Sequence, residues 1–291
     1  MNRLIVLSII AAFISGGDYC FTRPQSSSAI SRDSLFKDAV AFSVAPSGMM
    51  YVLDKGSNEL IKITPDGTIL GRTGGIGWSE TAFDSPADVY SQSDLRVYVS
   101  DYGNHRIEYF DGNLNYLSSL KLHDESDPSN QFGYPKSAAV DRNGSLFITD
   151  GENVRLVKIG ELNTVELTFG GVGSGEGKIT NPRRIRISQD DKVYIQDGQR
   201  IMVYDIYGNY LYVIPALANN HFRTFTVSEN SVFILDTSGV RGISKDMDTT
   251  ISYPVSSDFV DIGVNNDSMI FLTRHGLTII PLDPIWIRKR E

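Results

Sequence analysis

Cysteine, histidine and long apolar runs are scarce in this chain, and each scarcity narrows what the protein can be. The 291 residues include one cysteine, Cys20, so an intrachain disulfide is excluded. The four histidines never stand in the HxH or HxxxH spacing of a local metal-binding motif. No apolar segment reaches the length of about 20 residues that a membrane-spanning helix needs. We therefore expect neither a disulfide-stapled domain nor a stable membrane span.

Basic residues are also in the minority. The chain has 27 lysines and arginines against 35 aspartates and glutamates, which gives a net charge of −8. Affinity for nucleic acid comes mainly from neutralised phosphates, so an acidic chain is a poor electrostatic match to it. We expect no nucleic-acid partner. An RNA-binding function would require one broad basic face, which the overall charge disfavours.

The first apolar run has the form of a secretory signal. Arg3 precedes the apolar stretch Leu4–Ile14, and the small residues Ser15–Gly17 follow it. This is the order of charged region, apolar core and cleavage site in a signal peptide. The pattern predicts a signal peptide over 1–17, a polar linker over 18–34, and a periplasmic or secreted location for the mature protein.

A short phrase recurs six times along the rest of the chain. Apolar β-formers are followed by an acid in Tyr51–Asp54, Tyr98–Asp101, Phe147–Asp150, Tyr194–Asp197 and Phe233–Asp236, and the sixth copy, Ile270–Thr273, lacks the acid. Repeats spaced in this way, with Gly, Asn and Asp turns between short alternating segments, are typical of arrays of small sheets. The sequence predicts an all-β fold: a six-bladed β-propeller of four-stranded antiparallel blades over 35–291.

The third repeat illustrates the expected layout of a blade. We predict its four strands at Ser137–Val140, Leu146–Thr149, Val154–Ile159 and Val165–Phe169. The ring must also be closed at its last blade. Two segments could do this, Ile285–Ile287 near the C-terminus or the stretch Ala29–Phe36 near the N-terminus, and the sequence does not decide between them.

The second repeat resembles a known family. It reads Phe83-Asp-Ser-Pro-Ala-Asp-Val and then Val97-Tyr-Val-Ser-Asp-Tyr-Gly-Asn-His-Arg-Ile, and it is similar to the NHL repeat, whose signature includes the pair Asn104-His105. The Gly-rich linkers 74–83 and 170–179 also resemble those of the family. The resemblance implies a six-bladed propeller. It implies no single activity, since the family includes RNA- and protein-binding modules, receptor sensor domains and a metal-dependent lyase.

The repeated aspartates are expected to be structural. An aspartate at a strand end can accept the backbone N–H groups of the turn that follows. A basic residue comes soon after the acid in four repeats, at Arg106, Arg155, Arg200 and Arg241. Five repeated acids are more than one active centre would use, so we assign them to the turns.

The histidines are expected to lie on one face of the ring. This loop face carries the turns between the second and third strands of each blade and the connections from one blade to the next. On the predicted layout it holds His105, His123, His221 and His275. They come from different blades, so we expect no shared metal site and no cofactor.

Function should lie where the repeats differ, at the axis. Aligned first strands place Asp88, Arg184 and Asp261 in one ring, with Tyr90 and Arg186 two residues further along and the basic residues Lys136, Arg183 and Arg223 just before the strands. Two interpretations remain open. These eight residues could form a polar pocket for a small zwitterionic or anionic ligand or a partner's side chain. Alternatively, an Arg–Asp cluster plugs the channel, because buried charges need partners.

These observations predict an exported, monomeric binding module without enzymatic activity. It would bind an unknown protein or small-molecule ligand through its loop face and axial pocket, and the protruding stretches 76–84 and 122–134 give that face relief. The alternative is a metal-dependent lyase or hydrolase of a small substrate at the axis. That alternative would need metal ligands to converge there.

Overall fold

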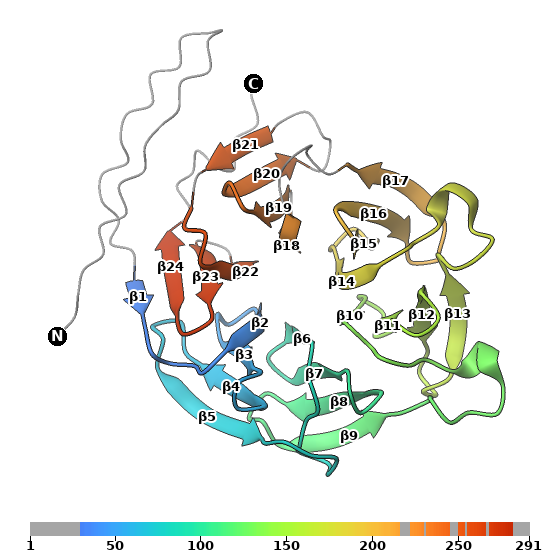
Figure 1. Ribbon diagram of the computed structural model, residues 1–291, viewed down its shortest axis with the longest axis horizontal. Coiled ribbons are helices and arrows are strands. Elements are labelled where there is room, and N and C mark those ends of the chain that lie inside the picture. Colours follow the sequence, from blue (N-terminus) through green and yellow to red (C-terminus); the bar gives the residue numbers. More distant parts are fainter. Residues whose placement is uncertain are drawn as a thin grey trace, which may run out of the picture.

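The protein is a ring of six small sheets. The computed structural model describes residues 30–215, 222–229, 231–244, 250–253, 255–265 and 268–281. In these residues the strands form six four-stranded antiparallel sheets around a central axis (Figure 1). The predicted all-β, six-bladed propeller is confirmed.

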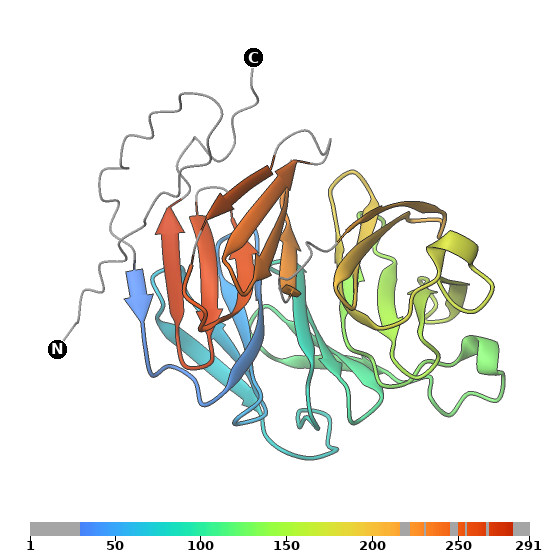
Figure 2. The ribbon, with the colours of Figure 1, turned by 45° about the horizontal axis from the view of Figure 1, so that its top comes forward.

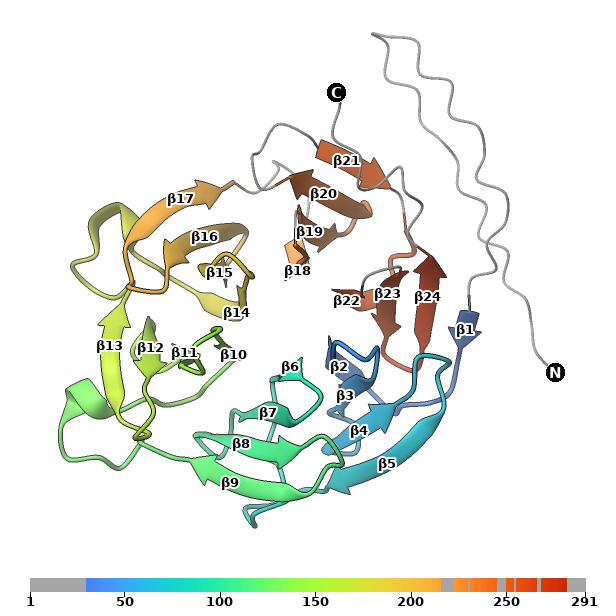
Figure 3. The ribbon, with the colours of Figure 1, turned by 180° about the vertical axis from the view of Figure 1, so that it is seen from behind.

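The first five blades follow one another along the chain. The first contains β2 (Ala39–Val44), β3 (Met50–Asp54), β4 (Glu59–Ile63) and β5 (Ile69–Gly74); the second contains β6 (Asp88–Ser93), β7 (Arg96–Asp101), β8 (Arg106–Asp111) and β9 (Tyr116–Leu120). The third contains β10 (Ala138–Val140), β11 (Leu146–Asp150), β12 (Arg155–Ile159) and β13 (Val165–Phe169). The fourth contains β14 (Pro182–Ile187), β15 (Lys192–Asp197), β16 (Arg200–Asp205) and β17 (Tyr210–Ile214), and the fifth β18 (Phe222–Val227), β19 (Ser231–Asp236), β20 (Val240–Ser244) and β21 (Thr250–Tyr253). In each, the first strand lines the axis and the fourth lies at the rim (Figure 3).

The last blade is completed by the N-terminal strand. It has the order β1-β24-β23-β22, with β22 at Phe259–Val264, β23 at Ser268–Thr273 and β24 at Leu277–Pro281. β1 (Ile30–Arg32) pairs antiparallel with β24, so the first and the last described strands of the chain lie in one sheet (Figure 2). β1 lies inside the stretch 18–34 that the sequence assigns to a linker. The competing segment, 285–287, is outside the described residues.

The second strand of each blade is buried because neighbouring blades cover both faces of every sheet. β3 and β11 are buried along their whole length, which explains why the recurring phrase is apolar without alternation. The apolar clusters lie between blades. In one of them Val52 and Ile61 of the first blade pack with Leu272 of the last. A single blade would expose these faces to water, so the ring is stable only when it is complete.

The loop face also carries two short 3₁₀ helices at the outer edge, η1 (Pro128–Asn130) and η2 (Gly175–Gly177). The stretch 76–84 protrudes, and its Trp78 side chain is 82% exposed. None of the helices in the described residues is long and apolar enough to cross a membrane. The expected signal peptide, 1–17, and Cys20 are outside those residues, and the predicted export stays a prediction.

Candidate functional site

The repeated aspartates hold turns together, as predicted. Asp54 accepts the backbone N–H groups of Lys37 and Asp38, both at 2.8 Å, and of Gly56 at 3.0 Å. It thereby ties the connection that leads into its blade to the turn after its second strand. In four later blades an arginine pairs with the equivalent carboxylate at 2.8 to 3.8 Å: Arg106 with Asp101, Arg155 with Asp150, Arg200 with Asp197 and Arg241 with Asp236. These carboxylates are thus already bonded to backbone N–H groups or arginines of the scaffold.

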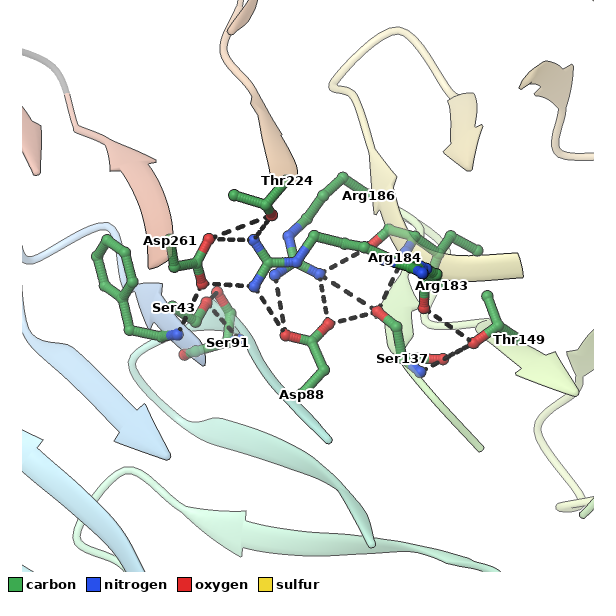
Figure 4. Close-up of polar contacts among 12 residues, drawn as sticks. Ser43, Asp88, Ser91, Ser137, Thr149, Arg183, Arg184, Arg186, Thr224 and Asp261 are labelled. Atoms are coloured by element: carbon green, nitrogen blue, oxygen red, sulfur yellow. Dashed lines mark hydrogen bonds and ion pairs between the residues drawn. The ribbon is translucent and has the colours of Figure 1, made fainter. Parts of the chain in front are cut away.

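Arg184 spans the axis of the ring. It starts on β14, and its guanidinium donates to Asp261 Oδ2 at 2.5 Å, to Thr224 Oγ1 at 2.6 Å and to Asp88 Oδ1 at 3.1 Å (Figure 4). A second bond runs from its Nη1 to Asp261 Oδ1. One side chain therefore connects the fourth blade with the second, fifth and last.

Arg186 and Ser137 complete the cluster. Arg186 lies two residues further along β14, on the same side of the strand, and it donates to both carboxylate oxygens of Asp88, at 2.9 and 3.2 Å. Ser137 donates its hydroxyl to Asp88 and accepts the backbone N–H of Ile185 at 3.1 Å. We call this cluster the axial network; its members are Asp88, Ser137, Arg184, Arg186, Thr224 and Asp261.

The charges of the axial network compensate one another. Burial alone would raise the pKa of Asp88, but Arg186 and Arg184 outweigh it and lower that pKa to about 2. Burial would lower the pKa of Arg184, but Asp261 and Asp88 raise it instead. Two arginines face two aspartates, and all four are at most 8% exposed. For these residues the geometry is that of a self-satisfied plug.

Tyr90 packs against this plug. The Arg186 guanidinium lies 5.7 Å from the centre of the Tyr90 ring, a cation–π distance. Burial raises the pKa of the Tyr90 hydroxyl to about 12, and the hydroxyl faces the Val140 carbonyl at 3.5 Å. Tyr90 is thus a packing partner of Arg186.

A cavity of about 570 Å³ opens beside the axial network, where Asp88 and Arg184 line it. Its walls come from the turns after the second strands, through Lys55 and Tyr102, and from the residues that lead into first strands, through Lys136, Arg183 and Arg223. Both kinds of segment belong to the loop face. The cavity is therefore the mouth of the axial channel on that face.

The cavity walls carry unpaired positive charge. Within the part of the chain that the structure describes, Lys55, Lys136 and Arg183 line the cavity without a carboxylate partner. Among the described residues Arg223 donates to two backbone carbonyls, to that of Phe259 at 2.7 Å and to that of Ser257. Burial lowers the pKa of Lys136, and the neighbouring Arg183 lowers it further. The one carboxylate in the lining, Asp88, is already bonded by two arginines.

Five of the eight residues predicted to bind a ligand line this cavity: Asp88, Lys136, Arg183, Arg184 and Arg223. The other three, Tyr90, Arg186 and Asp261, belong to the axial network or pack against it and do not line the cavity.

Sequence reasoning missed Lys55, Tyr102 and Gln196, which also line the cavity. A signal for them existed in the repeat. Lys55 and Tyr102 directly follow the repeated acid and Gln196 directly precedes it. The acid recurs in five of the six repeats and is structural, whereas its neighbours vary from repeat to repeat and line the cavity.

Two of the histidines come together at the outer part of the loop face. The rings of His105 and His123 are 4.2 Å apart between centroids, and Glu152 of the next blade lies beside them. His275 lies on the last blade, where its Nδ1 faces the Phe36 carbonyl at 3.4 Å. His221 is outside the described residues.

Comparisons with known proteins agree with the architecture. The family model for the NHL repeat matches residues 83–110. The human NHL repeat-containing protein 3 is 24% identical over 176 residues, which cover 55% of this chain and 49% of that protein. This chain thus matches about half the length of its curated relative. The match to the repeat and the six blades confirm the resemblance to NHL-repeat six-bladed β-propellers.

Solved structures with the same fold include two enzymes. A catalytically inactive virginiamycin B lyase from Staphylococcus aureus, solved with quinupristin, has a TM-score of 0.63 at 11% identity, with 88% of this chain and 99% of that chain covered. A gluconolactonase from Xanthomonas campestris has a TM-score of 0.66 at 11% identity, with 88% and 89% covered. At such identity the similarity shows the fold and not an activity.

Proposed function

We propose that this protein binds a small anionic molecule, one that carries a carboxylate or phosphate group, in the axial cavity of its loop face. The observation that carries the proposal is the charge of the lining. Four cationic side chains, Lys55, Lys136, Arg183 and Arg223, surround the cavity. The single carboxylate there, Asp88, has its oxygens bonded by Arg184 and Arg186.

An anion would relieve a repulsion that the free protein carries. Burial lowers the pKa of Lys136, and the positive charge of Arg183 lowers it further, which indicates that these two side chains repel each other. A carboxylate or phosphate between them would form charge-assisted hydrogen bonds, which are about twice as strong as neutral ones. Arginine supplies a planar fork for two oxygens and lysine a point charge, a combination suited to such groups.

The size and shape of the cavity suit a small molecule. Its volume of about 570 Å³ lies within the range of roughly 300 to 1,000 Å³ for ligand pockets. Tyr102 offers an aromatic surface, and Gln196 is fixed by a hydrogen bond from its side-chain nitrogen to the Arg223 carbonyl at 3.1 Å. Arg184 is held by the axial network, so one wall of the cavity is rigid before any ligand arrives.

The same lining favours binding over catalysis. Its described residues include no histidine, and their one carboxylate is engaged by arginines. The described wall therefore lacks a set of metal ligands, and its one carboxylate is not free to act as a general base. This supports a binding module over the metal-dependent lyase or hydrolase that the sequence left open as an alternative.

Calorimetric titration of the full chain with inorganic phosphate and with citrate, at constant ionic strength, tests the proposal. We expect saturable binding of at least one probe at one site per chain. Lys136→Met should weaken it by about 10- to 100-fold, because a hydrogen bond to a charged group contributes roughly 1.5 to 3 kcal/mol. Lys62→Met is the matched control, since Lys62 lies on β4 away from the cavity. Equal affinity of the two variants, or no binding of either probe, would contradict the proposal.

We also propose that the protein acts outside the cytoplasm. The support is the order of charged, apolar and small residues over 1–17. N-terminal sequencing of the protein from the periplasmic or secreted fraction should find a chain that begins after Gly17. An intact N-terminus confined to the cytoplasmic fraction would overturn this location.

A further inference from the structure

His105, His123 and Glu152 converge although they are far apart in the sequence. His105 lies in the turn between β7 and β8, His123 in the connection between β9 and β10, and Glu152 in the turn between β11 and β12. One potential metal-binding atom from each lies within 4.8 Å of the others. His123 Nδ1 is 3.2 Å from Glu152 Oε2. The second and third blades thus contribute imidazoles and a carboxylate to one place.

The backbone around this cluster makes room for it. At Gly133, an added Cβ would lie 1.9 Å from Glu152 Oε2 and 3.0 Å from its carboxyl carbon. Any other residue there would push the carboxylate away from His123. The cluster therefore depends on a glycine in the connection that carries His123.

The imidazoles are held by packing. The ring of His105 lies 3.9 Å from that of Tyr134, centroid to centroid. Its Nδ1 also faces the backbone N–H of Tyr134, but at 3.4 Å, a long distance for a hydrogen bond. This weak contact leaves the imidazole free to offer a nitrogen to a stronger ligand.

One atom of the cluster lacks a hydrogen-bond partner. His123 Nδ1 is buried, and it makes no hydrogen bond in the described structure despite its closeness to Glu152. Buried polar atoms are nearly always satisfied, so such an exception calls for an explanation such as an ion.

We propose that His105, His123 and Glu152 form a binding site for Zn²⁺ or a similar first-row divalent cation. Two imidazoles and a carboxylate are a donor set that zinc uses, with distances of about 2.0 to 2.2 Å and a fourth position for water. Ligand atoms of tetrahedral zinc lie roughly 3.4 Å apart on these distances. The His123–Glu152 separation already matches this spacing, and rotation of the exposed Glu152 and of His105 would close the rest.

The bound ion would fix the rim of the axial cavity. It would tie the connection 121–137 to the turns of two blades, and this connection contains Tyr134 and Lys136. Tyr134 also packs on Tyr102, with ring centroids 5.1 Å apart. Tyr102 and Lys136 line the cavity. The ion itself would be held outside the cavity. The zinc site can therefore be tested independently of the anion-binding site.

Equilibrium dialysis of the chelator-treated full chain against zinc chloride tests this site. We expect one zinc ion per chain and a higher melting temperature with zinc, because an ion that binds only the folded state stabilises it. Co²⁺ in place of zinc should give the visible absorption bands of a four-coordinate complex. His123→Ala and Glu152→Gln should each lose the bound equivalent, while their melting temperatures without metal stay close to that of the wild type.

His275→Ala is the matched control. This exposed histidine lies in the turn between the second and third strands of the last blade, as His105 does in the second blade. It should keep the zinc and the melting shift. Failure of the wild type to hold one zinc ion would overturn the proposal. Retention of the ion by both His123→Ala and Glu152→Gln would do the same.

Discussion

Arg183 and Arg184 are consecutive residues with opposite surroundings. Arg184 is 7% exposed and bonds to three other blades through Asp88, Thr224 and Asp261. Arg183 is exposed at the cavity and has no carboxylate partner among the described residues. The comparison separates two roles of charge at the axis. Buried charges that are fully paired build the scaffold, whereas charges left unpaired at a cavity remain available to a ligand.

The difference follows from the position of the two residues on β14. Arg184 and Arg186 are two residues apart, and both enter the axis, where they bond Asp88. Arg183 lies where the register between β14 and β15 shifts, and its side chain is exposed at the mouth of the channel. Removal of one partner from a buried pair leaves a charge without compensation, which is far more costly than removal of an exposed charge.

The largest expected effect is on stability when the paired arginine is changed. Arg184→Gln should lower the free energy of unfolding by about 3 to 5 kcal/mol. The change leaves Asp261 buried without a counter-charge and removes one of the two arginines that pair with Asp88. Urea unfolding of the variant and the wild type measures this. A variant as stable as the wild type would show that the axial network does not hold the ring together.

The neighbouring arginine should give the opposite result. Arg183→Gln should change the free energy of unfolding by less than about 0.5 kcal/mol, as is usual for exposed positions. Its affinity for phosphate or citrate should fall by about 10- to 100-fold, since it removes a charged hydrogen-bond donor from the cavity. Titration calorimetry tests the predicted loss of affinity, and urea unfolding tests the predicted stability. Lost stability with unchanged affinity would reverse the assignment of the two arginines.

Acid should weaken the axial network over a defined range. The folded-state pKa of Asp88, about 2, is below the unfolded value of about 3.9. The stabilisation is therefore complete above about pH 4, and it is lost as the pH falls through 2. This loss should amount to about 2 to 3 kcal/mol. It should be absent from Asp88→Asn, whose free energy of unfolding is lower throughout. Equal acid losses in both proteins would contradict the pairing.

A small effect on stability is also expected from the second unpaired cation, Lys136. Lys136→Met should leave the free energy of unfolding unchanged or raise it by less than about 1 kcal/mol, because it removes a partly buried charge that Arg183 also repels. The gain should shrink in high salt, which screens exposed charges. Melting curves at low and high ionic strength measure it. A marked loss of stability would mean that Lys136 has a structural partner.

Local features of the fold could be predicted from the sequence, whereas long-range ones could not. The predicted strands of the third blade agree with β10 to β13 to within one residue at each end, since alternation and turn residues are local signals. Closure of the ring by β1 depends on its pairing with β24, which is far away in the sequence. Both candidate segments satisfied the local pattern, so the sequence left that choice open.

The same contrast between predictable and unpredictable features applies to the candidate site. Alignment of the first strands brought Asp88, Arg184 and Asp261 together correctly, because the repeat places equivalent residues in equivalent positions. It did not tell which charges would be paired. Nor did it find that His123 and Glu152 meet, since this depends on the path of a long connection and on Gly133.

The most direct test of the central claim is a crystal of the protein soaked in a selenate salt, with anomalous scattering from selenium used to locate the anion. We predict a peak in the axial cavity, in contact with Lys136, Arg183 or Arg223, and none inside the axial network. Selenium peaks only at the outer surface, with the cavity empty, would contradict the claim that its unpaired cations form an anion-binding site.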